Sequence, residues 1–271
     1  MDGPVGTQLD RCGIWIGGDD WSAAALREAP GVVQQIHRDY ALAGAVVHTA
    51  NTFRTKRRNA GSDWETLTRT AIELARRGAE SVSVECQIAG SIAPLADCYR
   101  PDLSPNNSYP EHAELAHVLA DAGCDLLLCE TFPNVAEAVQ AVAACAETKV
   151  ETWVSFTAGP SSNLLNPSQI VEGARETIEV GARAVLVNCI PASDTLRFVK
   201  ALAKANLPVP IGAYANAGMS PDGHRWNSDE ASDPHQYALF ARQWRDAGAT
   251  IIGACCGTGP DHIEACCQEL D

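Results

Sequence analysis

The chain has 271 residues, of which 46% are hydrophobic and 20% are charged, and its formal net charge is −14. This length and composition suit a single α/β barrel with a large core and exclude a disordered chain. The acidic charge argues against nucleic acid and against an anionic membrane surface as partners, since neither attracts an acidic protein. No apolar run reaches the roughly 18 residues that span a membrane, and the N-terminus lacks a signal-peptide pattern, so we expect a cytoplasmic protein.

Short apolar runs recur along the whole chain. They are rich in Val, Ile and Leu and lack strict alternation, which is typical of strands that are buried on both faces of a parallel sheet. Such strands are predicted at Gly44–His48, Ser81–Ala89, Asp125–Cys129, Glu151–Thr157, Arg183–Asn188, Pro210–Tyr214 and Thr250–Gly253.

Amphipathic stretches separate these runs and predict helices. Asn134, Ser193 and Asp233 are expected to cap three of them, because their side chains can accept a hydrogen bond from the first helical turn. The predicted helices are Gly31–Ala43, Trp64–Arg77, Tyr109–Asp121, Val135–Glu147, Pro167–Val180, Asp194–Ala205, Pro234–Ala247 and a short one after Pro260.

Glycine follows four of the predicted helices, in "LAGA", "DAGCD", "EVGARA" and "DAGAT", and the next strand comes at once. A repeating helix–glycine–strand unit favours right-handed crossovers in a parallel sheet. We therefore predict one (β/α)8 TIM-type barrel domain over residues 1–271, not an open dinucleotide-binding sheet, because no GxGxxG motif follows a strand. Only seven strands are visible. A (β/α)8 barrel needs one more strand at the front. This first strand is either reduced to a residue or two, or lies in Ile14–Ile16, or lies upstream of residue 1.

Two long polar connections, residues 91–107 and 216–232, follow predicted strands. Both fall at the carboxyl ends of the strands, where barrel enzymes place their active sites.

Three of the eleven cysteines stand at the ends of predicted strands. Cys255 and Cys256 end the last strand, and Cys189 ends the strand two before it. Parallel strands point their carboxyl ends to one mouth, so three thiolates can converge on one zinc ion at about 2.3 Å and leave a fourth position open, as in catalytic zinc sites. The alternatives are that these cysteines fill the core, or that Cys255 and Cys256 form a strained disulfide.

The chain resembles the zinc-dependent homocysteine S-methyltransferases over nearly its whole length. The motifs that carry the resemblance are "DGPVGTQL" at 2–9, "NTF" at 51–53, "CETFPNVAEA" at 129–138, "VNC" at 187–189, "YANAG" at 214–218 and "GACCGTGPDHI" at 253–263. This family has a (β/α)8 barrel, and its zinc thiolates match Cys189, Cys255 and Cys256. The resemblance is strongest to its short, S-methylmethionine-dependent members.

Zinc would deprotonate the thiol of homocysteine, so methyl transfer needs no general base. Glu130 ends a predicted strand at the mouth and is expected to accept the substrate ammonium. The resemblance implies that Asp2 shares this role and that backbone N–H groups near Gly3 receive the carboxylate. Asn51, Thr52 and Asn216 are further candidates for hydrogen bonds to the substrate.

The methyl donor is expected to be small and cationic. Acidic residues in the two mouth loops favour such a donor, and the resemblance favours S-methylmethionine over betaine; the loop residues are Asp97, Asp102, Asp222, Asp229 and Glu230. Open alternatives are a family member that uses betaine or methylates another thiol or selenol, a zinc hydrolase on the same barrel, and a non-catalytic regulator that binds zinc or thiols.

Overall fold

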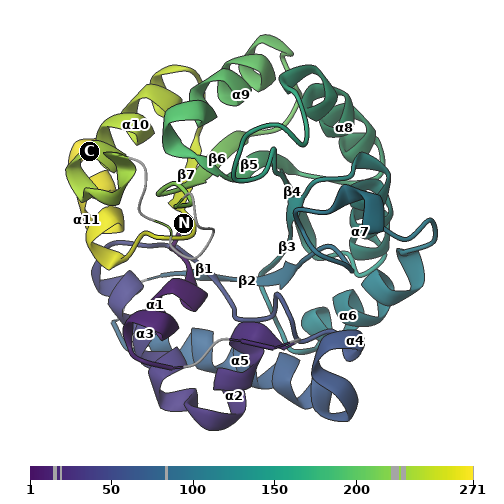
Figure 1. Cartoon of the computed structure of the whole chain (residues 1–271). Helices are drawn as coiled ribbons and strands as arrows, with labels where there is room; N and C mark the ends of the chain where they lie inside the picture. The colour runs from purple at the N-terminus through teal and green to yellow at the C-terminus, as the bar shows by residue number, and fades with distance from the viewer. Residues whose placement is uncertain (15–16, 19, 83–84, 221–225, 227–229, 271) are drawn as a thin grey trace.

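Seven parallel strands form one curled sheet, and the helices surround it on the outside (Figure 1). The computed structural model describes residues 1–270 except 15–16, 19, 83–84, 221–225 and 227–229. The strands follow one another in sequence order around the sheet, so each helix crosses from one strand to its neighbour. This arrangement confirms the predicted α/β class with a parallel sheet and is close to a TIM-type barrel.

The strands lie at the centre of the molecule. They are β1 (Val47–Thr49), β2 (Gln87–Ile92), β3 (Leu126–Phe132), β4 (Glu151–Phe156), β5 (Ala184–Pro191), β6 (Ile211–Asn216) and β7 (Ile251–Ala254).

The helices form the outer layer. They are α1 (Val5–Arg11), α2 (Ala25–Glu28), α3 (Pro30–Leu42), α4 (Arg57–Ala60), α5 (Trp64–Glu80), α6 (Tyr109–Asp121), α7 (Val135–Ala146), α8 (Pro167–Glu179), α9 (Ala192–Lys204), α10 (Pro234–Asp246) and α11 (Pro260–Leu270). Short 3-10 turns are η1 (Trp21–Ala24), η2 (Gly61–Asp63), η3 (Pro101–Leu103) and η4 (Glu230–Ser232).

The predicted helix boundaries hold where a cap defines them. Asn134 and Asp233 accept hydrogen bonds from the first turns of α7 and α10, as expected. The prediction for Ser193 is wrong, because α9 begins at Ala192, two residues before the predicted start, and Pro191 occupies the capping position. The four glycines that end α3, α6, α8 and α10 all have positive φ angles, so the chain turns there without a Cβ penalty; they are Gly44, Gly123, Gly181 and Gly248.

Two strands differ from their predicted bounds in ways that matter for the site. The strands β3 and β5 continue past Cys129 and Asn188, and each has a register shift at its carboxyl end. Bulges of this kind let a strand continue through polar residues and re-aim their side chains. A third strand, predicted at Ser81–Ala89, begins only at Gln87, where pairing with β1 starts; residues 83–84 lie outside the described residues.

The first residues of the chain lie between β7 and β1 (Figure 1). The Met1 nitrogen donates to Ile252 O at 2.6 Å, and the Ala254 N–H donates to Asp2 O at 3.1 Å. On the other side, the Asp2 N–H donates to Val47 O at 2.8 Å. Two residues therefore connect the two edge strands. The alternative position for a first strand, Ile14–Ile16, includes residues 15–16, which lie outside the described residues.

The apolar residues pack in two layers. The larger core lies between sheet and helices, while a smaller one fills the inside of the curled sheet with residues such as Leu126, Leu128 and Leu186. This inner core lies below the cavity that opens at the carboxyl ends of the strands. Among the described residues, the structure has no helix with the length and apolar character that a membrane span requires.

The contact between α3 and α5 gives a test of this packing. A Cβ at Gly78 would lie 2.8 Å from the Cβ of His37 and 3.1 Å from the Arg38 nitrogen, and it would also meet the carbonyl oxygen of Gln34. We expect Gly78→Ala to lower the free energy of unfolding by about 1–3 kcal/mol, because the two helices must move apart. Thermal and urea unfolding measure this change.

The matched control is Gly31→Ala at the exposed start of α3, where an added Cβ meets nothing within 4 Å. This substitution should be neutral or stabilising by up to about 1 kcal/mol, because alanine favours the helix. Equal effects of the two substitutions would contradict the close approach of α3 and α5.

Candidate active site

A cavity of about 540 Å³ opens at the carboxyl ends of the strands. Its wall brings together seven of the nine residues that the sequence singled out: Asp2, Gly3, Asn51, Glu130, Cys189, Cys255 and Cys256. The other two, Thr52 and Asn216, are fully buried behind this wall.

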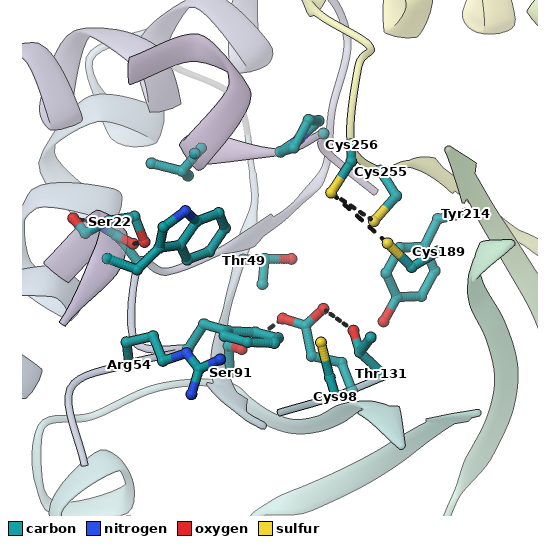
Figure 2. A pocket seen from close by; sticks show the side chains of 18 of the residues that line it. Ser22, Thr49, Arg54, Ser91, Cys98, Thr131, Cys189, Tyr214, Cys255 and Cys256 are labelled. Atoms are coloured by element: carbon teal, nitrogen blue, oxygen red, sulfur yellow. Dashed lines mark hydrogen bonds between the residues drawn. The ribbon is translucent and has the colours of Figure 1, made fainter. Parts of the chain in front are cut away.

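Three thiols meet on one side of the cavity (Figure 2). The Sγ atom of Cys256 lies 3.7 Å from that of Cys189 and 4.0 Å from that of Cys255, and all three sulfurs lie within 4.8 Å of one another. Three sulfurs at 2.3 Å from a tetrahedral ion are about 3.8 Å apart. The thiols therefore have the spacing that one metal ion of this kind requires.

The backbone of β5 aims Cys189 at the other two cysteines. Cys189 has a φ angle of +52° within the bulge of β5, a left-handed conformation that is uncommon for a residue with a side chain. The bulge interrupts the regular alternation of side chains along β5 and directs the Cys189 thiol into the cavity. The strained backbone conformation of Cys189 is therefore what brings its thiol to the other two cysteines.

The turn after β7 holds the other two cysteines against the end of β6. The Cys255 N–H donates to Ala215 O at 2.8 Å, and Cys256 O accepts from the Ala217 N–H at 2.9 Å. Gly257 has a φ angle of +87°, and a Cβ there would meet the carbonyl oxygen of Trp226. Only glycine fits this turn, which explains the glycine after the cysteine pair.

Several donors surround the Cys189 sulfur. The thiols of Cys255 and Cys256 lower the pKa of Cys189 well below its ordinary value, and the Tyr99 hydroxyl, at 3.0 Å from the sulfur, and the Asn216 amide act in the same direction. The pKa values of Cys255 and Cys256 are raised, chiefly because these thiols donate toward Cys189. A divalent cation would stabilise all three as thiolates, since metal binding releases thiol protons.

Glu130 lines the same cavity as the thiols. Its Oε1 accepts from the Ser91 hydroxyl at 2.5 Å, and its Oε2 lies 3.4 Å from the Thr131 hydroxyl. Burial raises the pKa of Glu130 to about 7, while the hydrogen bond from Ser91 opposes this shift. A buried carboxylate with so few donors can gain a cation as partner.

Asp2 forms part of the wall next to β1. Its Oδ2 accepts from the Thr49 N–H at 2.8 Å, and burial raises its pKa to about 7. Asp2 is 3% exposed, and its backbone hydrogen bonds to Val47 and Ala254 hold it between β1 and β7. Gly3 follows where the Tyr40 ring packs against the chain, and a Cβ at Gly3 would lie 2.8 Å from the Tyr40 hydroxyl.

The three amide and hydroxyl candidates mostly have protein partners. Asn51 exchanges two hydrogen bonds with Ser22, and the Thr52 hydroxyl donates to Ser91 O. The Oδ1 of Asn216 accepts from the Gly218 N–H. Thr52 and Asn216 therefore do not line the cavity, although the buried Nδ2 of Asn216 has no hydrogen-bond partner in the protein. Asn51 offers little free hydrogen-bonding capacity.

The acidic mouth residues are less concentrated than the sequence suggested. Asp97 lines the cavity, whereas Asp102 pairs with the exposed Arg100 and Glu230 is exposed at the start of η4. Asp222 and Asp229 lie outside the described residues.

Sequence reasoning missed the aromatic wall of the cavity. Trp21 and Phe53 pack edge to face with ring centroids 5.9 Å apart, and Tyr99 and Trp226 lie 6.4 Å apart. These rings come from four separate segments, so no spacing along the chain could have brought them together. The polar and proline-rich character of residues 91–107 was the one signal that pointed to Tyr99.

Comparisons with known proteins match this chain from end to end. A family model described as homocysteine S-methyltransferase matches residues 1–270. Homocysteine S-methyltransferase 1 of Zea mays is 30% identical over 301 residues, which cover 98% of this chain and 92% of that protein. The selenocysteine methyltransferase of Astragalus bisulcatus is 28% identical over 306 residues, 96% of this chain and 89% of that protein.

Solved structures match as well. The crystal structure of the homocysteine methyltransferase MmuM from Escherichia coli in its metallated form superimposes with a TM-score of 0.81 at 25% identity. The match covers 99% of this chain and 95% of MmuM.

The thiol cluster predicts one metal site per chain. We expect the wild type to bind about one equivalent of cobalt(II), with a thiolate-to-metal absorption band in the near ultraviolet. Cys255→Ser removes one of the three metal ligands. Loss of a group that only hydrogen-bonds to a ligand lowers metal affinity about 10–100-fold, so the cobalt affinity of Cys255→Ser should fall by more than this. Competition with a chelator, followed by absorbance, measures the change.

Cys86→Ser is the control, because Cys86 is a half-buried thiol just before β2, at the opposite end of the strands. It should bind cobalt like the wild type. Unchanged affinity in Cys255→Ser would exclude the cluster as the metal site.

Proposed function

Because the chain belongs to the homocysteine S-methyltransferase family, as its motifs predicted, we propose that it uses zinc to transfer a methyl group from a small cationic donor to homocysteine. Membership of this family confirms the prediction of a methyltransferase. The observation that carries the fuller proposal is the convergence of Cys189, Cys255 and Cys256 on a cavity that Glu130 also lines.

The donor set supports zinc as the metal. Three soft thiols with near-tetrahedral spacing suit this ion, and the half-exposed Cys255 and Cys256 leave a side of the cluster open to the cavity. Zinc bound there would keep the acceptor thiol deprotonated at neutral pH, where a free thiol is only a few per cent ionised. The protein then has to hold the acceptor and the donor in line.

The carboxylates supply a site for the amino end of homocysteine. In their ionised forms, Glu130 and Asp2 accept hydrogen bonds from the substrate ammonium, and the backbone near Gly3 receives its carboxylate. Both carboxylates are buried on the cavity wall, so an ammonium there relieves the cost of burying their charge.

The aromatic rings of the wall support a cationic donor. Trp21, Phe53, Tyr99 and Trp226 all lie on the cavity, and aromatic faces attract onium groups. We favour S-methylmethionine over betaine because the sequence resembles the short family members that use it. Arg54, also on the cavity wall, can pair with the carboxylate of either donor.

Another acceptor is the second candidate. The relative from Astragalus bisulcatus, named a selenocysteine methyltransferase, favours a selenol or a thiol other than homocysteine. The hydrolase and regulator alternatives find no support in a methyltransferase family, and we do not retain them.

We also infer that Met1 and Asp2 replace the first strand of a (β/α)8 barrel. Their hydrogen bonds to β7 and β1 support this inference, since they close the gap between the two edge strands. One barrel domain over residues 1–271 and a cytoplasmic role in methionine formation are part of the same proposal.

The test is methyl transfer by zinc-loaded protein. We expect methionine to form from homocysteine and S-methylmethionine, with activity lost in Cys255→Ser and kept in Cys86→Ser, because only the first substitution removes a metal ligand. Selenocysteine and betaine are offered in parallel reactions. Activity with betaine and none with S-methylmethionine would reject the proposed donor, and full activity of Cys255→Ser would reject zinc-thiolate chemistry.

The raised carboxyl pKa values predict a pH profile. Glu130 and Asp2 have pKa values of about 7, so below this pH they are protonated and lose their charge-assisted bond to the ammonium. We therefore expect kcat/KM for homocysteine to rise as the pH increases through about 7 and then to level off.

Glu130→Gln should lower kcat/KM by about 10–100-fold at pH 8, because an amide lacks the charge, and it should reduce the loss on acidification. Glu111→Gln is the control, since Glu111 pairs with Arg58 on the surface. A wild-type profile in Glu130→Gln would contradict the assigned role.

A further inference from the structure

The two strand ends that carry the acceptor site are both strained. In β3, Thr131 has a φ angle of +61°, and in β5, Cys189 has a φ angle of +52°. Each residue lies in a register shift of its strand. A β-branched residue such as threonine is a marked outlier in this region, so the surrounding structure must hold it there.

One side chain connects the two bulges. The Oδ1 of Asn188 accepts from the Thr131 N–H at 3.1 Å, and its Nδ2 donates to the Thr131 hydroxyl at 2.7 Å. The same Oδ1 accepts from the Ser155 hydroxyl at 2.8 Å. Asn188 is 1% exposed, so these bonds have no competition from bulk water.

The connection spans a strand. Since β4 lies between β3 and β5, the backbone ladder does not join the two bulged strands directly. Asn188 bonds to Ser155 on the adjacent strand β4 and, beyond it, to Thr131 on β3. Asn188 directly precedes Cys189 in the chain, and Thr131 directly follows Glu130. The hydrogen bonds between Asn188 and Thr131 therefore connect the residue next to the thiol with the residue next to the carboxylate.

The hydrogen bonds also set the direction of the Thr131 hydroxyl. Its oxygen accepts from the Asn188 amide, so its proton is free to point to Glu130 Oε2 at 3.4 Å. Ser91 donates to the other oxygen of the same carboxylate. The chain of donors thus runs from Asn188 on β5 through Thr131 to Glu130 and fixes this carboxylate relative to the thiol cluster. Figure 2 shows Thr131 and Ser91 on the cavity with the three thiols.

We propose that Asn188 is a positioning residue that sets the separation between the thiol cluster and Glu130 and thereby selects the chain length of the acceptor. This proposal rests on the proposed function, in which the sulfur of the acceptor meets the metal and its ammonium meets Glu130. Homocysteine and cysteine differ by one methylene between these two groups. A site with fixed ends accepts the longer molecule and cannot satisfy both ends of the shorter one.

The experiment compares homocysteine with cysteine in zinc-loaded protein. Calorimetry measures binding without a methyl donor, and kcat/KM is measured with S-methylmethionine. We expect the wild type to prefer homocysteine by about 10–200-fold, the usual effect of one methylene. In Asn188→Ala the preference for homocysteine over cysteine should fall at least about fivefold, and KM for homocysteine should rise. The zinc content should stay near one ion per chain.

Asn166→Ala is the control for a general loss of stability. Asn166 forms a capping box with Gln169 at the exposed start of α8, so its substitution deletes a helix-capping hydrogen bond without touching the cavity. Its preference for homocysteine should equal that of the wild type. Zinc content and thermal unfolding are measured on every variant.

A second pair of variants tests the link from the other strand. Thr131→Ala deletes the hydroxyl between Asn188 and Glu130, and Thr131→Ser keeps it. We expect Thr131→Ala to lose the preference as Asn188→Ala does and Thr131→Ser to retain it. This pair decides the question if Asn188→Ala does not fold.

The possible results separate the two proposals. Wild-type preference in both Asn188→Ala and Thr131→Ala overturns the role of Asn188 and leaves the proposed function intact. Selective binding of homocysteine without methyl transfer rejects the proposed reaction, while a loss of that selectivity in the variants still supports Asn188. A wild type that binds neither thiol rejects both.

Discussion

The carboxyl ends of parallel strands must meet at one side of a curled sheet, and the site depends on this constraint. Cys189 comes from β5 and Cys255 and Cys256 follow β7, yet their sulfurs lie within 4.8 Å of one another. No segment of the chain could assemble this cluster alone, because a vicinal cysteine pair supplies only two ligands. The sheet curvature brings the third thiol, and the bulge of β5 turns it inward.

The site also concentrates groups that are costly to bury. Glu130 and Asp2 are carboxyl groups at 9% and 3% exposure, and burial raises the pKa of each to about 7. Hydroxyl groups of Ser91 and Thr131 donate to Glu130, and the Thr49 N–H donates to Asp2. The Met1 ammonium acts on Asp2, and the His37 imidazole lies 4.0 Å from its Oδ2 but is uncharged at neutral pH, because burial lowers the pKa of His37 to about 3. A carboxylate in this condition gains most from a cationic ligand, which is why we assign the ammonium of the acceptor to this wall.

The sequence predicted the main features of the fold for clear physical reasons. Buried parallel strands need continuous apolar runs, and the glycines after α3, α6, α8 and α10 mark where the chain must adopt positive φ. The cysteine motifs and Glu130 were visible because they stand where apolar runs stop. The predicted bounds of β2, β3 and β5 were wrong, since a bulge carries polar residues through the ends of β3 and β5 and the first residues predicted for β2 do not pair with β1.

The sequence by itself determined the α/β class, the order of the elements and the residue types of the thiol cluster, because these depend on local periodicity and on strand order. Tertiary structure alone decided how the cluster is held. The bond from Tyr99 to Cys189, the aromatic wall and the bridge from Asn188 to Thr131 join residues far apart in the chain. It also decided that Asn51, Thr52 and Asn216 bond mainly to the protein, because a side chain's partners depend on which segments pack beside it.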